Sequence, residues 1–337
     1  MTKVAINGLG RIGRAALKIL LETKELEVGA VNDIVPIDNI AYLLKYDTVY
    51  GRYPKTVEAA KDHLTIDGKQ IPYLSQKDPA QLPWRELGID LVFECSGVFR
   101  KEEDLKKHIE AGASTVILSA PAKGSGVPTV VHGVNKADGA GVHILSCASC
   151  TTNAITPVVE VIDRRLGIQK ALMTTIHAYT ASQSLVDGPS KKIRRGRAGA
   201  ANFVPTSTGA AIATTKVLPV LEGKFDGVAV RGPVLSGSIA DITMLTKQQT
   251  TVEEVNSIFR DEAETAKYRD ILGATDDPLV SSDILQDPRA SVVDLRMTQV
   301  VDGDLVKVMA WYDNEWGYTS QMVKEAVRII SESKGGV

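Results

Sequence analysis

The sequence predicts an α/β domain with a largely parallel sheet, followed by an α+β domain whose sheet is mostly antiparallel. The first prediction rests on strand-like and helix-like segments that alternate through residues 1–150. The second rests on several long strand-like segments that follow one another in the remainder. A length of 337 residues suits this division, because domains typically hold ~100–200 residues each.

Composition limits the classes of partner. A formal net charge of -2 gives no reason to expect nucleic acid or a membrane as the primary partner. No apolar run reaches the ~18 residues of a membrane-spanning helix, and the first residues have the pattern of a strand rather than of a signal peptide. Three cysteines are too few for a disulfide framework, so we expect a cytoplasmic protein.

A glycine-rich turn opens the first domain. A buried strand, residues 3–7, leads into Gly8-Leu9-Gly10-Arg11-Ile12-Gly13, and an amphipathic helix follows. A second strand, residues 26–31, leads to Asp33, which lies 20 positions after Gly13 (33 − 13). This context is typical of a dinucleotide site, because the glycines let the backbone approach a pyrophosphate. The Asp33 carboxylate would bind the ribose hydroxyls and repel a 2′-phosphate, which predicts NAD rather than NADP.

The alternation continues through the first half. We expect strands at residues 90–95, 115–119, 130–133 and 143–145, and a helix at 102–111. In sheets of this kind, ligands bind beyond the carboxyl ends of the strands. Ser119 lies at such an end, which makes it a candidate contact on the nicotinamide side.

A cysteine lies where the last of these strands meets a helix. The junction reads Ser146-Cys147-Ala148-Ser149-Cys150-Thr151-Thr152-Asn153, and apolar residues at helical spacing continue to Leu166. Unpaired N–H groups and the positive end of the helix dipole favour a thiolate there. Cys150 is therefore a candidate nucleophile, although a cysteine at a strand end is otherwise more often a packing residue.

The second half of the chain has a different pattern of expected elements. A strand at 171–177 ends at His177, either a catalytic base or a buried core histidine. The long, irregular and basic segment 178–201 is either functional or a solvated face. A turn rich in hydroxyl groups and glycine follows at 204–209, with a helix to about residue 217. The remaining expected elements are long strands at 225–231, 238–245, 291–300 and 305–312, and a final helix after residues 313–318.

Several motifs together resemble one family over essentially the whole chain. They are Ala5-Ile6-Asn7-Gly8-Leu9-Gly10-Arg11-Ile12-Gly13-Arg14, Leu43-Leu44-Lys45-Tyr46-Asp47, Ala148-Ser149-Cys150-Thr151-Thr152-Asn153, Thr206-Ser207-Thr208-Gly209-Ala210-Ala211 and Trp311-Tyr312-Asp313-Asn314-Glu315-Trp316-Gly317-Tyr318. The chain resembles the phosphorylating glyceraldehyde-3-phosphate dehydrogenases. The resemblance implies a Rossmann NAD-binding domain (1–150, completed by a C-terminal helix, 317–334) and a catalytic domain (151–316). It also implies a cytoplasmic homotetramer that works in glycolysis or gluconeogenesis.

The resemblance also assigns roles. Cys150 matches the nucleophile and His177 the base. Besides the glycines Gly8, Gly10 and Gly13, the implied NAD contacts are Arg11, Ile12, Asp33, Lys77, Ser119 and Asn314. The groups implied to hold the two phosphates are Ser149, Thr151, Thr180, Arg195, Thr208, Gly209 and Arg231. No metal is implied.

The implied reaction is oxidation of glyceraldehyde 3-phosphate to 1,3-bisphosphoglycerate with NAD and inorganic phosphate. The Cys150 thiolate attacks the aldehyde, His177 takes the hydroxyl proton of the thiohemiacetal as hydride leaves, and phosphate attacks the thioester. We expect an imidazolium partner and the helix N-terminus to lower the thiol pKa by a few units from ~8.5, giving mostly thiolate.

The sequence departs from the family at Cys147, where asparagine is usual. Cys147 and Cys150 form a C-x-x-C spacing that either changes only the packing or provides a thiol able to resolve an oxidised nucleophile. Zinc is not expected, because a structural site needs four ligands. Asp33 and the proline of Gly188-Pro189 follow the NAD-dependent members, which supports NAD preference.

Three other functions compete with this interpretation. A dehydrogenase for erythrose 4-phosphate is the nearest, and the Thr206–Gly209 turn favours the three-carbon substrate instead. A nucleic-acid or surface binding module could use the basic segment, but the net charge of -2 disfavours that as the main role. The third is hydrolysis of the thioester instead of phosphorolysis, and the apparent second phosphate site disfavours it.

Overall fold

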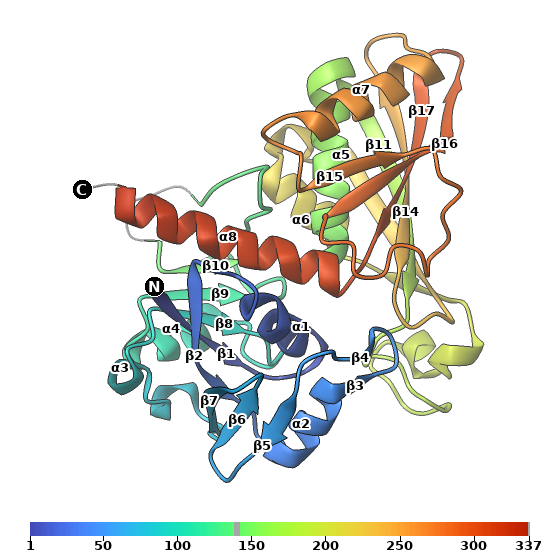
Figure 1. Ribbon diagram of the computed structural model, residues 1–337. Helices are drawn as coiled ribbons and strands as arrows, with labels where there is room; N and C mark the ends of the chain where they lie inside the picture. The colour runs from blue at the N-terminus through green and yellow to red at the C-terminus, as the bar shows by residue number, and fades with distance from the viewer. Residues whose placement is uncertain (138–141, 336–337) are drawn as a thin grey trace. The chain divides into compact units, whose positions relative to one another are not determined.

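The computed structural model describes residues 1–137 and 142–335, which form two compact units (Figure 1). Unit 1 comprises Met1–Val130, Lys136–Ala148 and Met322–Val337. Unit 2 comprises Val131–Asn135 and Ser149–Gln321. The two predicted fold classes are both confirmed, as follows.

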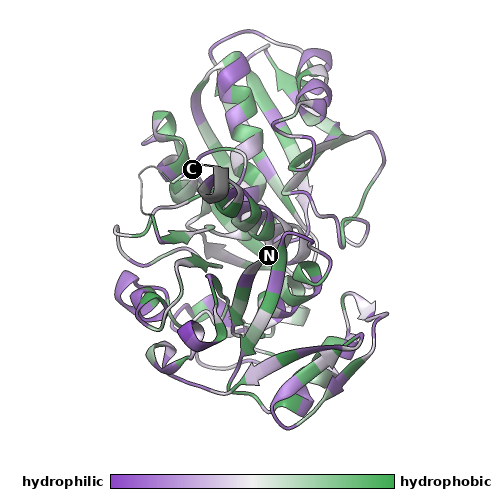
Figure 2. Cartoon of the chain, turned by 60° about the vertical axis from the view of Figure 1, so that its left-hand side comes forward, coloured by the Kyte–Doolittle hydropathy of each residue, from purple (hydrophilic) through white to green (hydrophobic). Residues whose placement is uncertain are grey.

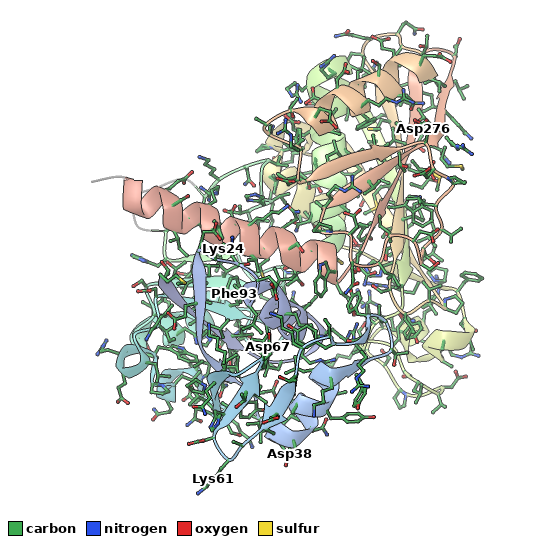
Figure 3. All side chains as sticks on the ribbon, viewed as in Figure 1. Lys24, Asp38, Lys61, Asp67, Phe93 and Asp276 are labelled. Atoms are coloured by element: carbon green, nitrogen blue, oxygen red, sulfur yellow. The ribbon has the colours of Figure 1, made fainter. Side chains whose placement is uncertain are left out.

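Unit 1 is built on a sheet of eight strands. Their order is β10 (Ile144–Ser146), β9 (Thr115–Leu118), β8 (Leu91–Glu94), β1 (Thr2–Asn7), β2 (Leu26–Asn32), β7 (Lys69–Leu74), β6 (His63–Ile66) and β5 (Val57–Ala59). Neighbours from β10 to β7 are parallel, and the last two pairs are antiparallel. The central strands are buried on both faces, which is why β8 is a continuous apolar run before Glu94. Phe93, labelled in Figure 3, lies among these strands, whereas Asp38 and Lys61 lie at the periphery.

The helices of unit 1 connect these strands. They are α1 (Arg11–Leu20), α2 (Ile37–Lys45), α3 (Trp84–Leu87) and α4 (Glu102–Glu110), with the 3-10 turn η1 (Pro79–Gln81). A small two-stranded sheet joins β3 (Tyr46–Asp47) to β4 (Gly51–Arg52). The strand predicted at 130–133 is wrong: Thr129 makes only an isolated bridge to Ser146, and the chain then turns.

Unit 2 is built on a sheet of seven strands. Their order is β12 (Val204–Ser207), β13 (Phe225–Gly232), β11 (Ile168–Ala178), β14 (Ser238–Thr246), β17 (Leu305–Tyr312), β16 (Ser291–Val301) and β15 (Leu272–Thr275). The pairs β11–β13 and β15–β16 are parallel and the others antiparallel, so the sheet is mostly antiparallel. Strand β14 alternates strictly between buried and half-buried residues, because only one face of this sheet meets the core.

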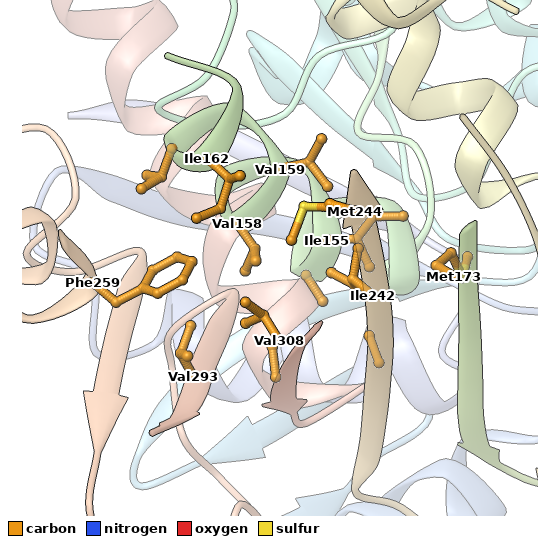
Figure 4. Packing of buried hydrophobic residues seen from close by; sticks show 14 of the residues in the cluster. Ile155, Val158, Val159, Ile162, Met173, Ile242, Met244, Phe259, Val293 and Val308 are labelled. Atoms are coloured by element: carbon orange, nitrogen blue, oxygen red, sulfur yellow. The ribbon is translucent and has the colours of Figure 1, made fainter. Parts of the chain in front are cut away.

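One face of the unit 2 sheet is covered by α5 (Cys150–Leu166), α6 (Ala210–Val217) and α7 (Val252–Glu264). Figure 4 shows the apolar face of α5 against side chains of β14, β16, β17 and α7. Burying one such Ile, Val or Phe side chain stabilises the fold by about 1.5–3 kcal/mol. Pro157 lies inside α5, and its ring cannot donate the usual helical hydrogen bond. Three 3-10 turns complete the unit: η2 (Ile193–Gly196), η3 (Gly199–Ala201) and η4 (Pro219–Leu221).

The final helix, α8 (Trp316–Gly335), begins in unit 2 and continues in unit 1 from Met322. Its residues Met322, Val323 and Ala326 are buried. Figure 2 shows green hydrophobic stretches along the strands and helices striped in both colours, as expected for amphipathic helices. Within the described residues, no helix is both long and apolar enough to span a membrane.

Candidate active site

The site is organised around the first turn of α5. Ser149 is the N-cap residue, and its Oγ accepts a hydrogen bond of 3.1 Å from the Thr152 N–H. Just before it, Ala148 has a φ of 56°, a left-handed conformation that turns the chain from β10 into the helix. Cys150 is therefore the first helical residue, and its own N–H and that of Thr151 favour the thiolate form of its side chain.

His177 lies beside this cysteine. Its Nε2 is 3.4 Å from the Cys150 Sγ, and only 3% of the residue is exposed. The opposite ring nitrogen, Nδ1, is 2.7 Å from the carbonyl oxygen of Ala178, which accepts a hydrogen bond in the tautomer that carries its proton on Nδ1. With the proton on Nδ1, the lone pair of Nε2 faces the thiol. This is the arrangement that a general base for Cys150 requires.

Strand pairing brings Arg231 to the same place. In the parallel pair β11–β13, Arg231 is the register partner of His177. Its Nη1 contacts the imidazole Nδ1 and donates to the Ala178 carbonyl oxygen at 3.1 Å. Its Nε is buried without a hydrogen-bond partner. A guanidinium with an unused donor can bind an anion of the substrate.

Burial sets the protonation of the pair. It lowers the pKa of His177 to about 3, and the positive charge of Arg231 adds to this effect. Burial also raises the pKa of the Cys150 thiol above its usual value, although Arg231 and the Thr151 hydroxyl act in the opposite direction. Burial thus acts against the expected thiolate–imidazolium pair, whereas Arg231 and the helix N-terminus favour the thiolate. Burial penalises both charged forms more than the helix N-terminus favours the thiolate.

Tyr312 is a residue that sequence reasoning missed. Its ring meets that of His177 edge-on, with centroids 6.0 Å apart. Its hydroxyl lies 3.0 Å from Thr151 Oγ1 and 2.8 Å from Thr175 Oγ1, and burial raises the pKa of the phenol. It stood inside the Trp311–Tyr318 motif, but its contact with Thr151 joins residues 161 positions apart. No local pattern could reveal that contact.

A second cation, Arg195, is held by hydroxyl groups. Its Nε donates to Thr206 Oγ1 at 3.0 Å and its Nη1 to Ser182 Oγ at 3.3 Å, and this serine in turn lies 2.8 Å from Thr180 Oγ1. Burial and the charge of Arg231 lower the pKa of Arg195. Both guanidiniums also act on His177, so positive charge converges beside the nucleophile. Such a setting suits phosphate groups.

The other predicted phosphate contacts lie at helix N-termini. Gly209 precedes the first residue of α6, and Thr208 Oγ1 accepts a hydrogen bond of 3.2 Å from the Ala210 N–H. Ser149 Oγ and Thr151 Oγ1 are already engaged by Thr152 and Tyr312. To bind a phosphate, these two hydroxyls would therefore have to make a hydrogen bond in addition to those they already make.

A separate cavity of about 420 Å³ lies in unit 1 at the glycine-rich turn. It is lined by Gly8, Gly10, Asp33, Lys77 and neighbouring residues. Gly8 has a φ of 93°, and a Cβ there would lie 2.5 Å from the Ser96 backbone. A Cβ on Gly10 would meet nothing within 4 Å, so a ligand can approach this backbone closely. The cavity therefore fits the dinucleotide pyrophosphate that the motif predicts.

The predicted NAD contacts differ in how they are placed. Asp33 accepts hydrogen bonds from the Leu9 N–H (2.6 Å) and the Val35 N–H (2.9 Å), and each oxygen keeps a lone pair for a ribose hydroxyl. The Arg11 guanidinium pairs with Asp47 at 2.5 Å, so at the start of α1 we expect a phosphate to meet the N-terminus of the helix rather than this side chain.

The remaining predicted contacts belong to other elements than the glycine-rich turn. Ser119 follows β9, and its hydroxyl acts to lower the pKa of the Cys95 thiol, although burial raises that pKa more. Asn314 belongs to unit 2, where its Oδ1 accepts hydrogen bonds from the Gly237 N–H (3.1 Å) and the Ser238 hydroxyl (2.9 Å). Across residues 1–137 and 142–335, no group of three or more His, Cys, Asp or Glu side chains is arranged to hold a metal ion.

Cys147 lies in a different setting from Cys150. It is 3% exposed, and burial, Glu325 and Cys95 raise its pKa well above that of an ordinary thiol. Besides burial, the groups that act most on Cys150 are Arg231 and Thr151. These surroundings favour the packing interpretation of Cys147 over the redox one.

Comparison with known proteins agrees with the geometry. Residues 2–102 match the family model "Glyceraldehyde 3-phosphate dehydrogenase, NAD binding domain", and residues 149–314 match the C-terminal domain of the same family. A glyceraldehyde-3-phosphate dehydrogenase of Streptomyces coelicolor is 48% identical over 324 residues, covering 95% of this chain and 96% of its own. Those of Zymomonas mobilis (45%, covering 97% and 98%) and Thermotoga maritima (47%, covering 96% and 97%) are similar over the same extent. The chain belongs to the glyceraldehyde-3-phosphate dehydrogenase family.

Proposed function

We propose that this protein oxidises D-glyceraldehyde 3-phosphate to 1,3-bisphosphoglycerate, using NAD and inorganic phosphate, as a step of glycolysis or gluconeogenesis. The observation that carries the proposal is the 3.4 Å contact between Cys150 Sγ and His177 Nε2 at the start of α5, with two guanidiniums nearby. A nucleophile, a base and an anion site are the parts that this reaction needs.

The base acts twice in this proposal. The neutral His177 first takes the thiol proton as Cys150 attacks the aldehyde carbon, which turns two neutral groups into an ion pair only when substrate is present. It then takes the hydroxyl proton of the thiohemiacetal as the C–H bond breaks. NAD, when bound, accepts the hydride. Between the two steps His177 returns the thiol proton to the former aldehyde oxygen, which forms the thiohemiacetal hydroxyl, and a pKa far below that of ordinary histidine favours this return.

The anion site explains why phosphate rather than water should take the acyl group. Arg231 has a buried Nε with no partner, and Arg195 is held by Thr206 and Ser182. Thr180, Thr208, Gly209, Ser149 and Thr151 complete the set of proposed phosphate contacts. The cations hold the substrate phosphate and the attacking phosphate near the thioester carbon, where orientation alone contributes much of the rate.

The cofactor proposal assigns NAD to the cavity of unit 1. Gly8, Gly10, Gly13 and the N-terminus of α1 would hold the pyrophosphate, and Asp33 the adenine ribose. Lys77, Ser119 and Asn314 are the remaining proposed contacts. In domain terms, residues 1–150 with helix 317–334 bind NAD, and residues 151–316 carry the chemistry.

We further propose a cytoplasmic homotetramer. Support comes from apolar side chains on the face of the unit 2 sheet away from its helices: Leu172 is 66% exposed and Val228 52%. A cavity of about 990 Å³, lined in part by Leu172 and Leu305, lies on the same unit. Light scattering with size-exclusion chromatography tests the tetramer, and a monomer at micromolar concentration would contradict it.

The test of the activity is steady-state formation of NADH from glyceraldehyde 3-phosphate, with and without inorganic phosphate. Sustained turnover should require phosphate and should vanish in Cys150→Ser. Full turnover without phosphate would identify a hydrolytic enzyme instead. A higher kcat/KM for erythrose 4-phosphate would move the substrate assignment to the four-carbon sugar.

A further inference from the structure

A buried carboxylate is hydrogen-bonded to residues that line the dinucleotide cavity and takes no part in the proposed reaction. Glu94, the last residue of β8, is fully buried. Its Oε2 accepts hydrogen bonds from the Asn7 side-chain amide (2.5 Å) and the His108 Nε2–H (3.0 Å). Its Oε1 accepts from the backbone N–H (2.8 Å) and the hydroxyl (2.5 Å) of Ser96. The four groups are all N–H or O–H donors, so the carboxylate accepts four hydrogen bonds.

The direction of the hydrogen bond from His108 is fixed. The indole N–H of Trp84 lies 3.0 Å from His108 Nδ1, and an indole nitrogen can only donate. His108 Nδ1 must therefore accept, so the ring proton is on Nε2. That nitrogen faces Glu94, which consequently has to be an acceptor.

The direction is also fixed on the side of Asn7. The Gln76 backbone N–H donates to Asn32 Oδ1 at 2.9 Å, so the Asn32 amide cannot be flipped. Its NH₂ group donates to Asn7 Oδ1 at 2.7 Å, and this leaves the NH₂ group of Asn7 facing Glu94. A backbone N–H, which cannot reverse, thus sets the orientation of both asparagines.

Ser96 is oriented in the same way. Its Oγ accepts a hydrogen bond of 3.2 Å from the Val98 N–H, so its own proton points to Glu94. The hydrogen bonds from His108, Asn7 and Ser96 therefore all end on the two carboxylate oxygens of Glu94. A glutamine at position 94 would present an NH₂ group to fixed donors, and buried donors left facing each other are costly.

Several residues of this hydrogen-bond network line the cavity. Asn7, Asn32 and Ser96 all line it, and the backbone of Ser96 is the surface against which Gly8 packs. We propose that Glu94 is a positioning residue for the dinucleotide: it accepts every hydrogen bond of this network and so holds the glycine-rich turn and the end of β8 in the geometry that binds NAD. The inference rests on NAD being the ligand of the cavity and goes beyond the proposed reaction.

The test is the dissociation constant of NAD for the full chain, measured by quenching of tryptophan fluorescence. Glu94→Gln should weaken binding roughly tenfold, as expected for one buried unpaired donor. The swap Asn7→Asp with Glu94→Gln returns a carboxylate to the network, where it can accept from both Asn32 and Gln at position 94. The double variant should recover part of the affinity. Alkylation of Cys150 without NAD should proceed at the wild-type rate in both variants.

Glu262→Gln is the matched control, because Glu262 is also buried and hydrogen-bonded, by Arg164 and Arg165 in unit 2. It should leave NAD binding unchanged. The proposal is overturned if Glu94→Gln binds NAD within twofold of wild type, or if the double variant binds no more tightly than the single one. It is also overturned if neither variant folds by circular dichroism, since Glu94 would then serve folding alone. Failure of the wild-type chain to bind NAD would instead refute the proposed function.

Discussion

His177 and Arg231 are register partners on the parallel strands β11 and β13, and both reach the carbonyl oxygen of Ala178. The cation therefore lies against the far side of the imidazole from the Cys150 thiol. This placement favours a neutral His177 and at the same time the Cys150 thiolate. A nearby positive charge disfavours the imidazolium, which is a second cation, and stabilises the thiolate, which is an anion.

Replacing Arg231 should therefore slow the nucleophile. In Arg231→Gln we expect the pKa of Cys150 to rise further, and alkylation by iodoacetamide at pH 8 to slow on the order of tenfold. The pH–rate profile of alkylation measures the shift. Arg197→Gln is the control, because Arg197 is an exposed arginine paired with Asp187. An unchanged profile in Arg231→Gln would show that the guanidinium does not act on the thiol.

The buried His177 should make folding stability depend on pH. Unfolded histidine takes up a proton near pH 6.5, whereas His177 in the folded chain does so only at about 3. Between these values the unfolded state binds the extra proton. Stability should thus be fully present above pH 6.5 and fall as pH decreases, by up to about 1.4 kcal/mol per pH unit. Urea unfolding of wild type and His177→Asn at pH 5 and pH 7 measures this. Equal pH slopes would contradict the burial of a neutral ring.

Tyr312 should tune the site through Thr151. Tyr312→Phe removes a hydroxyl that bonds to Thr151 and Thr175, so we expect a loss of about 1 kcal/mol in stability and a several-fold fall in kcat. Tyr268→Phe is the control in the same unit, because the Tyr268 hydroxyl bonds to Glu160. That change should alter stability but leave kcat in place. A kcat for Tyr312→Phe equal to wild type would confine its role to packing.

Cys147 should not protect the nucleophile from oxidation. The thiolate is the form that attacks an oxidised sulfur, and burial keeps Cys147 protonated. After mild peroxide, peptide mapping should find oxidised Cys150 with no disulfide to Cys147, and Cys147→Ser should be over-oxidised at the wild-type rate. A Cys147–Cys150 disulfide in the map would restore the redox interpretation.

Asp33 should determine cofactor preference. Asp33→Ala removes the proposed ribose acceptor and the acceptor for the Leu9 N–H, so kcat/KM for NAD should fall on the order of tenfold. The value for NADP should fall less, because repulsion of the 2′-phosphate is relieved. Comparable values for NAD and NADP in the wild-type chain would show that the carboxylate does not discriminate.

Local patterns predicted the elements that carry the site. The glycine-rich turn, the start of α5 at Cys150 and the end of β11 near His177 each follow from a signal within a few residues. The sequence holds two further local signals. Asp67-Gly68 joins β6 to β7 as a hairpin with positive φ at both residues, and Thr251 caps α7 with Glu254 three residues later.

The remaining features depend on contacts that no local pattern contains. Tyr312 reaches Thr151 across 161 positions and Asn7 reaches Glu94 across 87. The protonation of Cys150 and His177 likewise depends on burial, which arises only when the sheet and α5 pack together. The start of the helix at Cys150 is visible in the sequence, whereas the burial that opposes charge on Cys150 and His177 is not.

The most direct test of the covalent mechanism is a single turnover without inorganic phosphate. Rapid mixing of the chain with NAD and glyceraldehyde 3-phosphate should give a burst of NADH stoichiometric with chains, followed by near arrest. Mass spectrometry should then place the acyl group on the Cys150 peptide. Cys150→Ser should show neither. A burst of the same size in Cys150→Ser, or an acyl group on another residue, would contradict the account.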